Sequence, residues 1–354
     1  MEGNRMRHLS SLIVILVLAA GVAAEDFQVP FSVEEPAGVA RVAEPVSGGL
    51  PLPRGRFPAG QPLALFRADG TELPVQVSPL VVETDGSLRW VLLDFQDDLP
   101  ARGKKSYVLK AVAPAVGPAA APLALKVADT PDAVTVDTGR MVLVVSRRKP
   151  FALVDSVTVG GAVVATGRHV AYEQMFGRAG WNDPAPWQVR RFEAAAPESV
   201  TLHYAGPLRV TVEIFGRFAD DPLKAGYRAW ITTWAGSTRA WVKYTLANSN
   251  PDERTVLPVK RSMIELATPA ADGTTLLGTA GAPLEVQGRA WLHQGLRFFQ
   301  ADQDILGAAK AGSGDQVLWT GDGRQGRPAG WIAARGPSTV YACDALFVNH
   351  PARR

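Results

Sequence analysis

The sequence contains a single cysteine, Cys343, among its 354 residues. An intramolecular disulfide, a cysteine-rich metal site and a dithiol redox pair are therefore excluded. Cys343 lies in the alternating stretch YACDALFV, where we expect an inert buried thiol. Neither positive nor negative charge is in large excess, since the formal net charge is only +3. The sequence also has no basic run interleaved with aromatic residues. We therefore expect no nucleic-acid partner.

Histidines are few, and no cofactor motif is present. Apart from His8, the chain has His169, His203, His293 and His350, no two of which are spaced as metal ligands. The glycine-rich residues 321–330 lack the strand–loop–helix context and the lysine of a phosphate-binding loop. The sequence thus predicts no metal site and no cofactor. It gives no indication of calcium and leaves calcium binding open.

The N-terminus has the pattern of an export signal. Arg5 and Arg7 precede the apolar run Leu12–Ala20, which is followed by small residues up to Ala24. The run is shorter than the ~20 apolar residues of a membrane span. Residues 1–24 are therefore predicted to be a signal peptide, with an uncleaved anchor as the alternative. The mature protein is expected to be secreted or periplasmic and not membrane-bound.

Helical periodicity is almost absent, and the pattern is one of short strands separated by turns. The only helix that we expect is Ala301–Ala311. Asp69-Gly70 and Asp85-Gly86 mark turns in the first hundred residues, and residues 113–122 have the composition of a linker. The predicted fold class is all-β: a small N-terminal β-barrel at residues 25–122, then a large antiparallel β-sandwich at residues 123–354.

The segment Glu44–Phe57, EPVSGGLPLPRGRF, interrupts this pattern with two adjacent glycines and three prolines. It cannot be a helix and is a poor central strand. We expect Gly48-Gly49 to adopt backbone angles forbidden to other residues, so that the chain crosses the barrel between two strands. In a second interpretation, Arg54 and Arg56 of this segment meet an acidic sugar.

Two stretches of the N-terminal half carry a family resemblance. The sequence GVARVAEPVSGGLPLPRGRF at residues 38–57 is followed by LPVQVSPLVVETDGSLRWVLLDF at residues 73–95. Their order and spacing resemble the small RIFT-type barrel of exo-type rhamnogalacturonan lyase-like proteins. The strand Met141–Ser146, after Thr138-Gly139, is similar to the central β-sandwich of the same proteins. The resemblance implies an acidic polysaccharide such as rhamnogalacturonan as the partner.

Proteins of this kind also carry a helical α/α toroid whose groove takes part in catalysis. The chain ends at Arg354, about where that part would begin. The resemblance therefore leaves enzymatic activity uncertain. We expect either a fragment or a short homologue, a non-catalytic β portion that scaffolds or binds pectic polysaccharide.

The segment most typical of a binding site is the expected loop Tyr172–Arg191. Aromatic rings can stack on sugar rings, and amide, carboxylate and guanidinium groups can bond hydroxyls or carboxylates. The candidate substrate-binding residues are Tyr172, Trp181, Asn182, Asp183, Trp187, Arg190 and Arg191. The alternative is a loop whose tryptophans pack back onto the sandwich.

The predicted hairpin Tyr227–Ala247 carries Trp230, Trp234 and Trp241, for which we expect packing on the sheet, with a sugar-binding face as the second interpretation. A self-sufficient carbohydrate-active enzyme, a lyase or a mutarotase-like protein, is the alternative function. It would need an acid and a base, and His203 and His293 on one concave sheet are the weak catalytic candidates.

Overall fold

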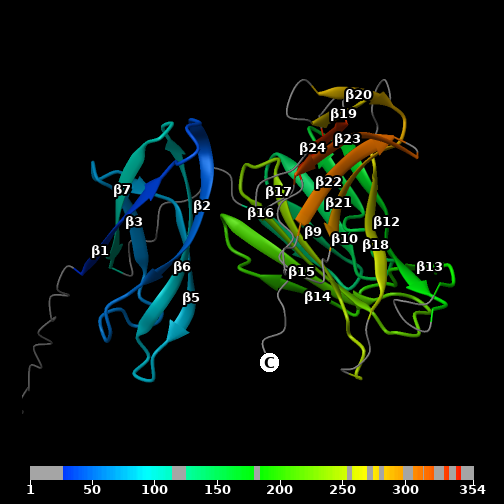
Figure 1. Cartoon of the computed structure of the whole chain (residues 1–354). Coiled ribbons are helices and arrows are strands. Elements are labelled where there is room, and N and C mark those ends of the chain that lie inside the picture. The colour runs from blue at the N-terminus through cyan, green and yellow to red at the C-terminus, as the bar shows by residue number, and fades with distance from the viewer. Residues whose placement is uncertain are drawn as a thin grey trace, which may run out of the picture.

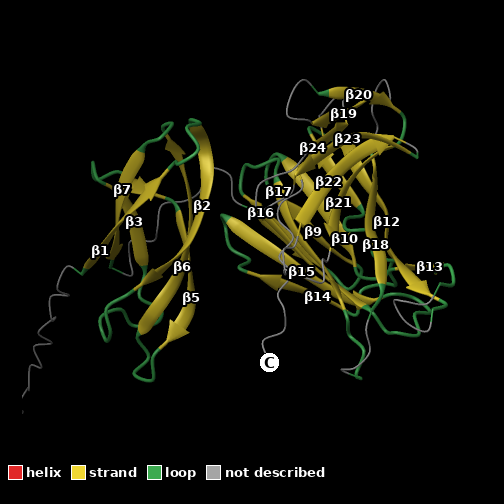
Figure 2. Cartoon of the chain, in the orientation of Figure 1, coloured by secondary structure: helices red, strands yellow, loops and turns green. Residues whose placement is uncertain are grey.

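The computed structural model describes residues 27–113, 125–178, 184–252, 257–268, 274–278, 283–297, 306–313, 315–322, 331–334 and 340–343. The predicted signal peptide and most of the predicted linker lie outside these ranges. The ordered elements in them are all strands, and every strand pairing is antiparallel (Figures 1 and 2). The prediction of an all-β fold is confirmed. No helix in these ranges is long and apolar enough to cross a membrane.

The first seven strands enclose one hydrophobic cluster, and we call this unit the barrel. They are β1 (Gln28–Glu34), β2 (Arg41–Pro51), β3 (Leu63–Arg67), β4 (Glu72–Leu73), β5 (Val75–Val82), β6 (Leu88–Leu99) and β7 (Lys104–Ala111). They pair in two sheets, in the orders β1-β7-β3-β4 and β2-β6-β5. Because side chains alternate along a strand, Val91, Leu93 and Phe95 of β6 face the cluster. Trp90, Leu92 and Asp94 face outward.

The segment Glu44–Phe57 is not a crossing for most of its length. It continues β2 as far as Pro51, and among the strands that the structure describes β2 pairs with β6 alone, at the edge of its sheet. Gly48 and Gly49 do not have positive φ, so the expectation of forbidden backbone angles was wrong. An edge strand tolerates proline because one side of it needs no ladder donors. Left-handed residues stand on either side of the Gly48-Gly49 pair: Ala43, at the bulge where β2 slips its register against β6, and Gly55, after β2 ends.

The second unit is a β-sandwich. One sheet has the order β13-β12-β11-β10-β9-β8, with β18 also paired to β12, and the other has the order β14-β15-β16-β17. The strands of the first are β8 (Lys126–Asp129), β9 (Ala133–Asp137), β10 (Met141–Ser146), β11 (Ser156–Val159), β12 (Ala162–Phe176), β13 (Gln188–Glu193) and β18 (Val259–Ala267). Those of the second are β14 (Ser199–His203), β15 (Arg209–Arg217), β16 (Gly226–Trp234) and β17 (Ala240–Ala247).

Both sheets of the sandwich contribute to one core. Val136, Leu143 and Tyr172 of the first sheet lie in the same cluster as Ile214 and Ile231 of the second. The alternation that places Val210, Val212 and Ile214 inward sends the neighbouring residues of β15 to the outer face. That outer face is therefore available for function, whereas the inner face is fully used in packing.

The C-terminal strands form two further sheets, β20-β19-β24-β25 and β21-β22-β23. Their bounds are β19 (Thr274–Gly278), β20 (Leu284–Gln287), β21 (Ala290–Arg297), β22 (Leu306–Ser313), β23 (Gln316–Asp322), β24 (Trp331–Ala334) and β25 (Val340–Cys343). The helix expected at Ala301–Ala311 was wrong where the structure describes it, because Leu306–Ala311 lies in β22. Pairing with β21 and β23 on both sides overrides the helical preference of its alanines.

Candidate functional site

The outer face of the β14–β17 sheet gathers polar, charged and aromatic side chains. Register places Thr201, Glu213, Trp230 and Lys243 in one row across the four strands. Residues directly opposite on antiparallel strands point to the same side of the sheet, about 5 Å apart. The row therefore brings together the carboxylate of Glu213, the indole of Trp230 and the ammonium group of Lys243, which lie on three different strands. We call this surface the sandwich face.

His203 and Glu213 form a hydrogen-bonded pair on the sandwich face. Nε2 of His203 lies 2.7 Å from Oε2 of Glu213, and the imidazole side chain is 42% exposed. The other carboxylate oxygen, Oε1, lies 3.0 Å from Nε of Arg228. Arg228 thus fixes the carboxylate that orients the imidazole, and a half-exposed base is held in a defined position.

Trp230 lies between two cations. The guanidinium carbon of Arg228 is 5.2 Å from the centre of the indole, and Nζ of Lys243 is 5.1 Å from it. Both distances lie within the range of a cation–π contact. Within the described part of the chain no carboxylate pairs with Lys243. The ammonium group is therefore free to meet an anionic ligand beside an aromatic ring.

Trp241 extends the aromatic surface. It lies on β17, is 73% exposed, and packs edge to face against the buried Trp234, with the ring centres 5.9 Å apart. Beside it, the hydroxyl groups of Thr211 and Thr232 share a hydrogen bond of 2.8 Å. Of the three hairpin tryptophans, Trp234 packs on the sheet as expected, whereas Trp241 is open to solvent.

The loop residues expected to bind substrate are only partly brought together. Trp181, Asn182 and Asp183 lie outside the described residues. Tyr172 is fully buried, and its hydroxyl donates to Asp221 at 2.7 Å. Including Tyr172 in the substrate-binding set was wrong, because its ring stacks on Phe192 inside the core.

Trp187 and the two arginines lie at the end of this loop and along β13. Trp187 is half-buried under Arg178, whose guanidinium carbon is 4.8 Å from the ring centre. Arg190 is exposed and lies over the ring of Phe192. The interactions with Arg178 and Phe192 hold Trp187 and Arg190 against their own sheet.

Arg191 belongs to a cluster of charged side chains that joins β12, β13 and β18. Its guanidinium lies 2.7 Å from Nε2 of His169 and 2.7 Å from Glu193. His169 in turn lies 3.3 Å from Glu265, which also binds Arg289. Each charged side chain of this cluster thus has a partner within the protein, and the cluster needs no ligand to satisfy it.

The two catalytic candidates lie on different sheets. His203 ends β14, whereas His293 lies on β21, opposite Lys310 of β22. The side chain of His293 is outside the described residues, so the pairing of the two imidazoles stays a prediction. Among the residues that the structure describes, no three His, Cys, Asp or Glu side chains gather in a way that could hold a metal ion.

Comparison with known families identifies the N-terminal unit. Residues 37–103 match the family model of the PcRGLX-like N-terminal RIFT barrel domain. The match covers β2 to β6, less than half of the chain, and supports a rhamnogalacturonan lyase-like N-terminal barrel. The resemblance read from residues 38–57 and 73–95 is thereby confirmed. No curated protein matches the sequence.

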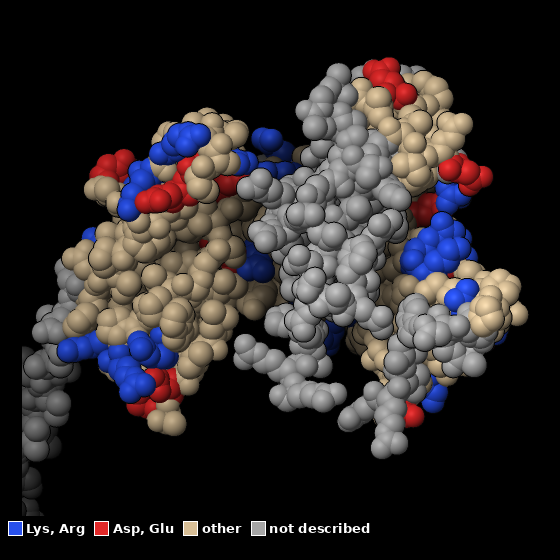
Figure 3. Space-filling view, viewed as in Figure 1, with Lys and Arg blue, Asp and Glu red and all other residues tan. Residues whose placement is uncertain are grey.

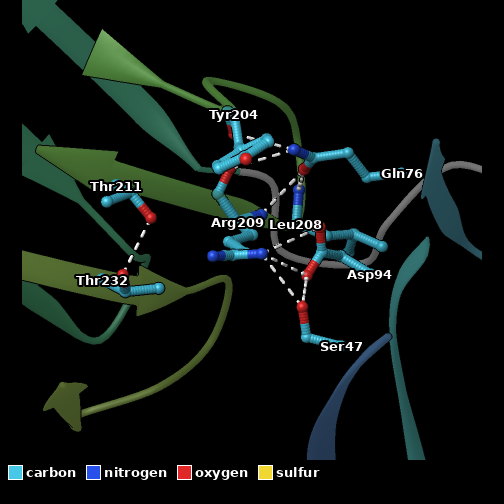
Figure 4. Close-up of polar contacts among 8 residues, drawn as sticks. All are labelled: Ser47, Gln76, Asp94, Tyr204, Leu208, Arg209, Thr211 and Thr232. Atoms are coloured by element: carbon cyan, nitrogen blue, oxygen red, sulfur yellow. Dashed lines mark hydrogen bonds and ion pairs between the residues drawn. The ribbon is translucent and has the colours of Figure 1, made fainter. Parts of the chain in front are cut away.

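The RIFT barrel binds the sandwich through a small set of buried polar groups (Figure 4). The side chain of Asp94 is fully buried, accepts from the Ser47 hydroxyl at 2.5 Å, and accepts from the Arg209 guanidinium at 3.1 Å. Burial raises the pKa of Asp94, while Ser47 and Arg209 act to lower it. A charge pair this well enclosed fixes the two units relative to one another, since separating them would leave a buried charge without a partner.

Gln76 of the RIFT barrel completes the junction. Its Nε2 donates to the carbonyl oxygens of Tyr204 at 2.7 Å and Arg209 at 3.2 Å, and its Oε1 accepts from the N–H groups of Leu208 and Arg209. Nε2 of Gln96 donates to the carbonyl oxygen of Ala235, and the guanidinium of Arg239 forms an exposed ion pair with Glu44. We call this set of contacts the junction.

Glu213, Arg228 and Lys243 were not among the residues predicted from the sequence. A usable signal was present: Arg228, Trp230 and Thr232 alternate with buried Tyr227, Ala229 and Ile231 along one strand. Alternation alone, however, does not identify the partner strand or its register. The row on the sandwich face becomes visible only when three strands are aligned.

Proposed function

We propose that this chain is the carbohydrate-binding β portion of a rhamnogalacturonan lyase-like protein, and that it holds an acidic pectic polysaccharide on the sandwich face. The observation that carries the proposal is the indole of Trp230 placed between Arg228 and Lys243. A uronate-containing chain offers apolar sugar faces for an indole and carboxylates for a guanidinium or ammonium group. The RIFT barrel match supports the same class of protein.

The distribution of surface charge favours recognition of an anion by a few nearby cations over attraction by the charge of the whole molecule. Figure 3 shows Lys and Arg mixed with Asp and Glu at both ends of the visible face of the RIFT barrel, with an uncharged band between them. The net charge of +3 is too small to attract a polyanion by itself. Affinity for an acidic polysaccharide would therefore depend on the few cations beside the aromatic rings.

The test is retention in native gels that contain rhamnogalacturonan I, compared between wild type and Trp230→Ala and Lys243→Ala variants. We expect each variant to lose about fivefold to tenfold in affinity, because a stacked ring or a charge-assisted contact contributes about 1–1.5 kcal/mol. The Lys243→Ala loss should shrink as salt is raised, since exposed charges are screened. Lys126→Ala, which removes an exposed lysine from β8, is the matched control and should bind as wild type does.

Unchanged retention of both variants would contradict a binding site on the sandwich face. Loss of retention in Trp187→Ala alone would instead move the site to the loop that ends at β13. Melting temperatures of all variants should stay close to wild type, because Trp230 and Lys243 lie outside the core clusters.

One observation favours a second function, that of an enzyme. The His203–Glu213 pair has the geometry of an oriented general base, with the carboxylate held by Arg228. A lyase using this base would generate the absorbance of an unsaturated uronate from rhamnogalacturonan I. Steady growth of that absorbance with purified protein, lost in His203→Ala, would establish the enzyme, whereas a flat trace supports binding alone.

A further inference from the structure

The outer face of the barrel sheet β2-β6-β5 leads directly into the junction. Gln76, Asp94 and Ser47 are register partners and form one row across its three strands. The next row toward the other end of the sheet is Ser78, Leu92 and Gly49, and beyond it lies Trp90. The sheet face that holds the sandwich through the first row therefore continues, uncovered by the junction, toward Trp90.

The junction also shows which contact of the sandwich lies nearer to Trp90. Arg209 is opposite Trp234 in register and projects from the sandwich face, and its guanidinium reaches the row of Asp94 and Ser47. The neighbouring strand end, Ala235, is held by Gln96, two residues farther along β6 and away from Trp90. Along β6, the contact made by Arg209 from the sandwich face therefore lies two residues nearer to Trp90 than the contact made by Ala235.

Trp90 is shaped as an open platform. It is 40% exposed on the outer face of β6, with exposed Leu80 beside it. A Cβ atom at Gly49 would stand 3.8 Å from Cε3 of the indole and 3.9 Å from Leu80. Because position 49 is glycine, no side chain from that residue covers this part of the ring. The arrangement leaves a flat aromatic surface that a sugar ring can contact.

The two aromatic sites are equally far from the junction. Trp90 precedes Asp94 by four residues on β6, and Glu213, the register partner of Trp230, follows Arg209 by four residues on β15. At about 3.3 Å per residue, each indole lies roughly 13 Å from the junction along its own strand. The two strand segments together measure about 26 Å, and the Arg209 and Asp94 side chains that join them add their own length, a span that an extended oligosaccharide can bridge.

We propose that the Trp90 platform of the barrel and the sandwich face are two walls of one binding surface, and that a single polysaccharide chain contacts both. The barrel wall is uncharged and suits the apolar face of a neutral sugar ring. The sandwich wall supplies Arg228 and Lys243 for carboxylates. An acidic polysaccharide that also carries neutral deoxy sugars would match both walls. This inference rests on the proposed function and extends it to the barrel.

The experiment compares ligands of different length. Binding of short rhamnogalacturonan oligosaccharides, which reach one wall only, and of long ones is measured by calorimetry for wild type, Trp90→Ala and Gly49→Val. We expect both variants to lose about fivefold to tenfold in affinity for the long ligands, because a second contact on the same chain acts at a high effective concentration. Affinity for short ligands that occupy the sandwich wall should be unchanged.

Gly49→Val retains the Trp90 side chain, so it tests the platform even if Trp90→Ala fails to fold. The new side chain would lie in ordinary contact with the indole and cover it, and a β-branched residue suits an edge strand. Val42→Ala, at the far end of β2 and 79% exposed, is the matched control and should bind ligands of every length as wild type does.

The outcomes separate the two proposals. If wild type binds no acidic oligosaccharide of any length, the proposed function itself is wrong. If wild type binds and Trp230→Ala weakens binding, but Trp90→Ala and Gly49→Val bind long ligands normally, the two-walled surface is wrong and the sandwich face stands. Equal losses for short and long ligands in Gly49→Val would place the whole site on the barrel and would also contradict the proposal.

Discussion

Asp97 is the residue on which the polar contacts of the RIFT barrel converge. Its carboxylate accepts from Arg67 at 2.6 and 3.0 Å, from the Tyr107 hydroxyl at 3.0 Å and from Lys105 at 3.3 Å, although its side chain is only 1% exposed. Burial opposes the ionised form, but Arg67 and the other donors prevail and lower the pKa of Asp97 to about 2. The barrel therefore depends on this carboxylate staying charged.

Stability of the barrel should fall in acid for this reason. The folded-state pKa of about 2 lies below the ordinary aspartate value, so the stabilisation is present above pH 4 and is lost as pH falls from about 4 through about 2. Asp97→Asn should cost about 2–4 kcal/mol at pH 7, because Arg67 keeps a charge without its partner. Urea unfolding at pH 7 and pH 3 measures both effects.

Asp132→Asn is the control for this prediction. Asp132 pairs with Arg148 at an exposed site, where an ion pair contributes little to stability. Equal stability of Asp97→Asn and Asp132→Asn at pH 7 would show that the buried network does not stabilise the barrel.

Single residues also show how far the sequence alone could lead. Trp241 and Tyr172 are both aromatic residues of strands, yet one is 73% exposed and the other is fully buried. Alternation gives two faces, and the face that turns inward depends on which other sheet packs against it. The stretches at residues 38–57 and 73–95 were more informative, because their order of turns, prolines and buried strand pointed to a particular barrel.

At the scale of elements, the close approach of β15 and β16 depends on Gly216. A Cβ atom there would stand 2.2 Å from the hydroxyl oxygen of Tyr227. Tyr227 is fully buried, stacks on Phe151 and donates to the carbonyl oxygen of Ala195 at 2.8 Å. The tyrosine therefore has no room to give way without losing its hydrogen bond or its stacking partner.

Gly216→Ala should destabilise the sandwich by about 1–3 kcal/mol through overpacking. Gly48→Ala in β2 is the matched control, since nothing lies within 4 Å of its added Cβ atom and its φ is not positive. Thermal unfolding followed by circular dichroism gives both values. A Gly216→Ala melting temperature as high as that of Gly48→Ala would show that the strands relax freely around the added methyl group.

The two secondary-structure predictions that were wrong have the same physical cause. Ala301–Ala311 has the composition of a helix, and Glu44–Pro51 has the composition of a loop, but β22 and β2 are both strands. In each case a neighbouring strand supplies the hydrogen bonds that local propensity does not favour. Long-range pairing of this kind cannot be read from a window of ten residues.

At the scale of the whole molecule, the junction decides whether the two units move as one. Gln76→Ala combined with Arg209→Ala removes the hydrogen bonds that Gln76 makes to β15 and its preceding turn, and leaves Asp94 buried without its cation. We expect the RIFT barrel and the sandwich to unfold in two separate calorimetric transitions, with a larger radius of gyration in X-ray scattering. Arg239→Ala, which removes only an exposed ion pair to Glu44, should keep one transition. A single transition and an unchanged radius in the double variant would mean that the junction does not hold the units together.

Gln76 binds main-chain atoms of the sandwich, and these contacts limit which residues near the junction can change during evolution. Its carboxamide donates two hydrogen bonds to carbonyl oxygens and accepts two from N–H groups, so it binds the backbone of residues 204–209 and not their side chains. Substitutions at Leu208 and Tyr204 leave these four hydrogen bonds in place, because none of the four involves a side chain of either residue. Position 206 cannot drift in this way, because a Cβ atom on Gly206 would lie 2.3 Å from the Gln76 amide carbon. Among relatives that share this arrangement, a glutamine at one position and a glycine at the other should be inherited together.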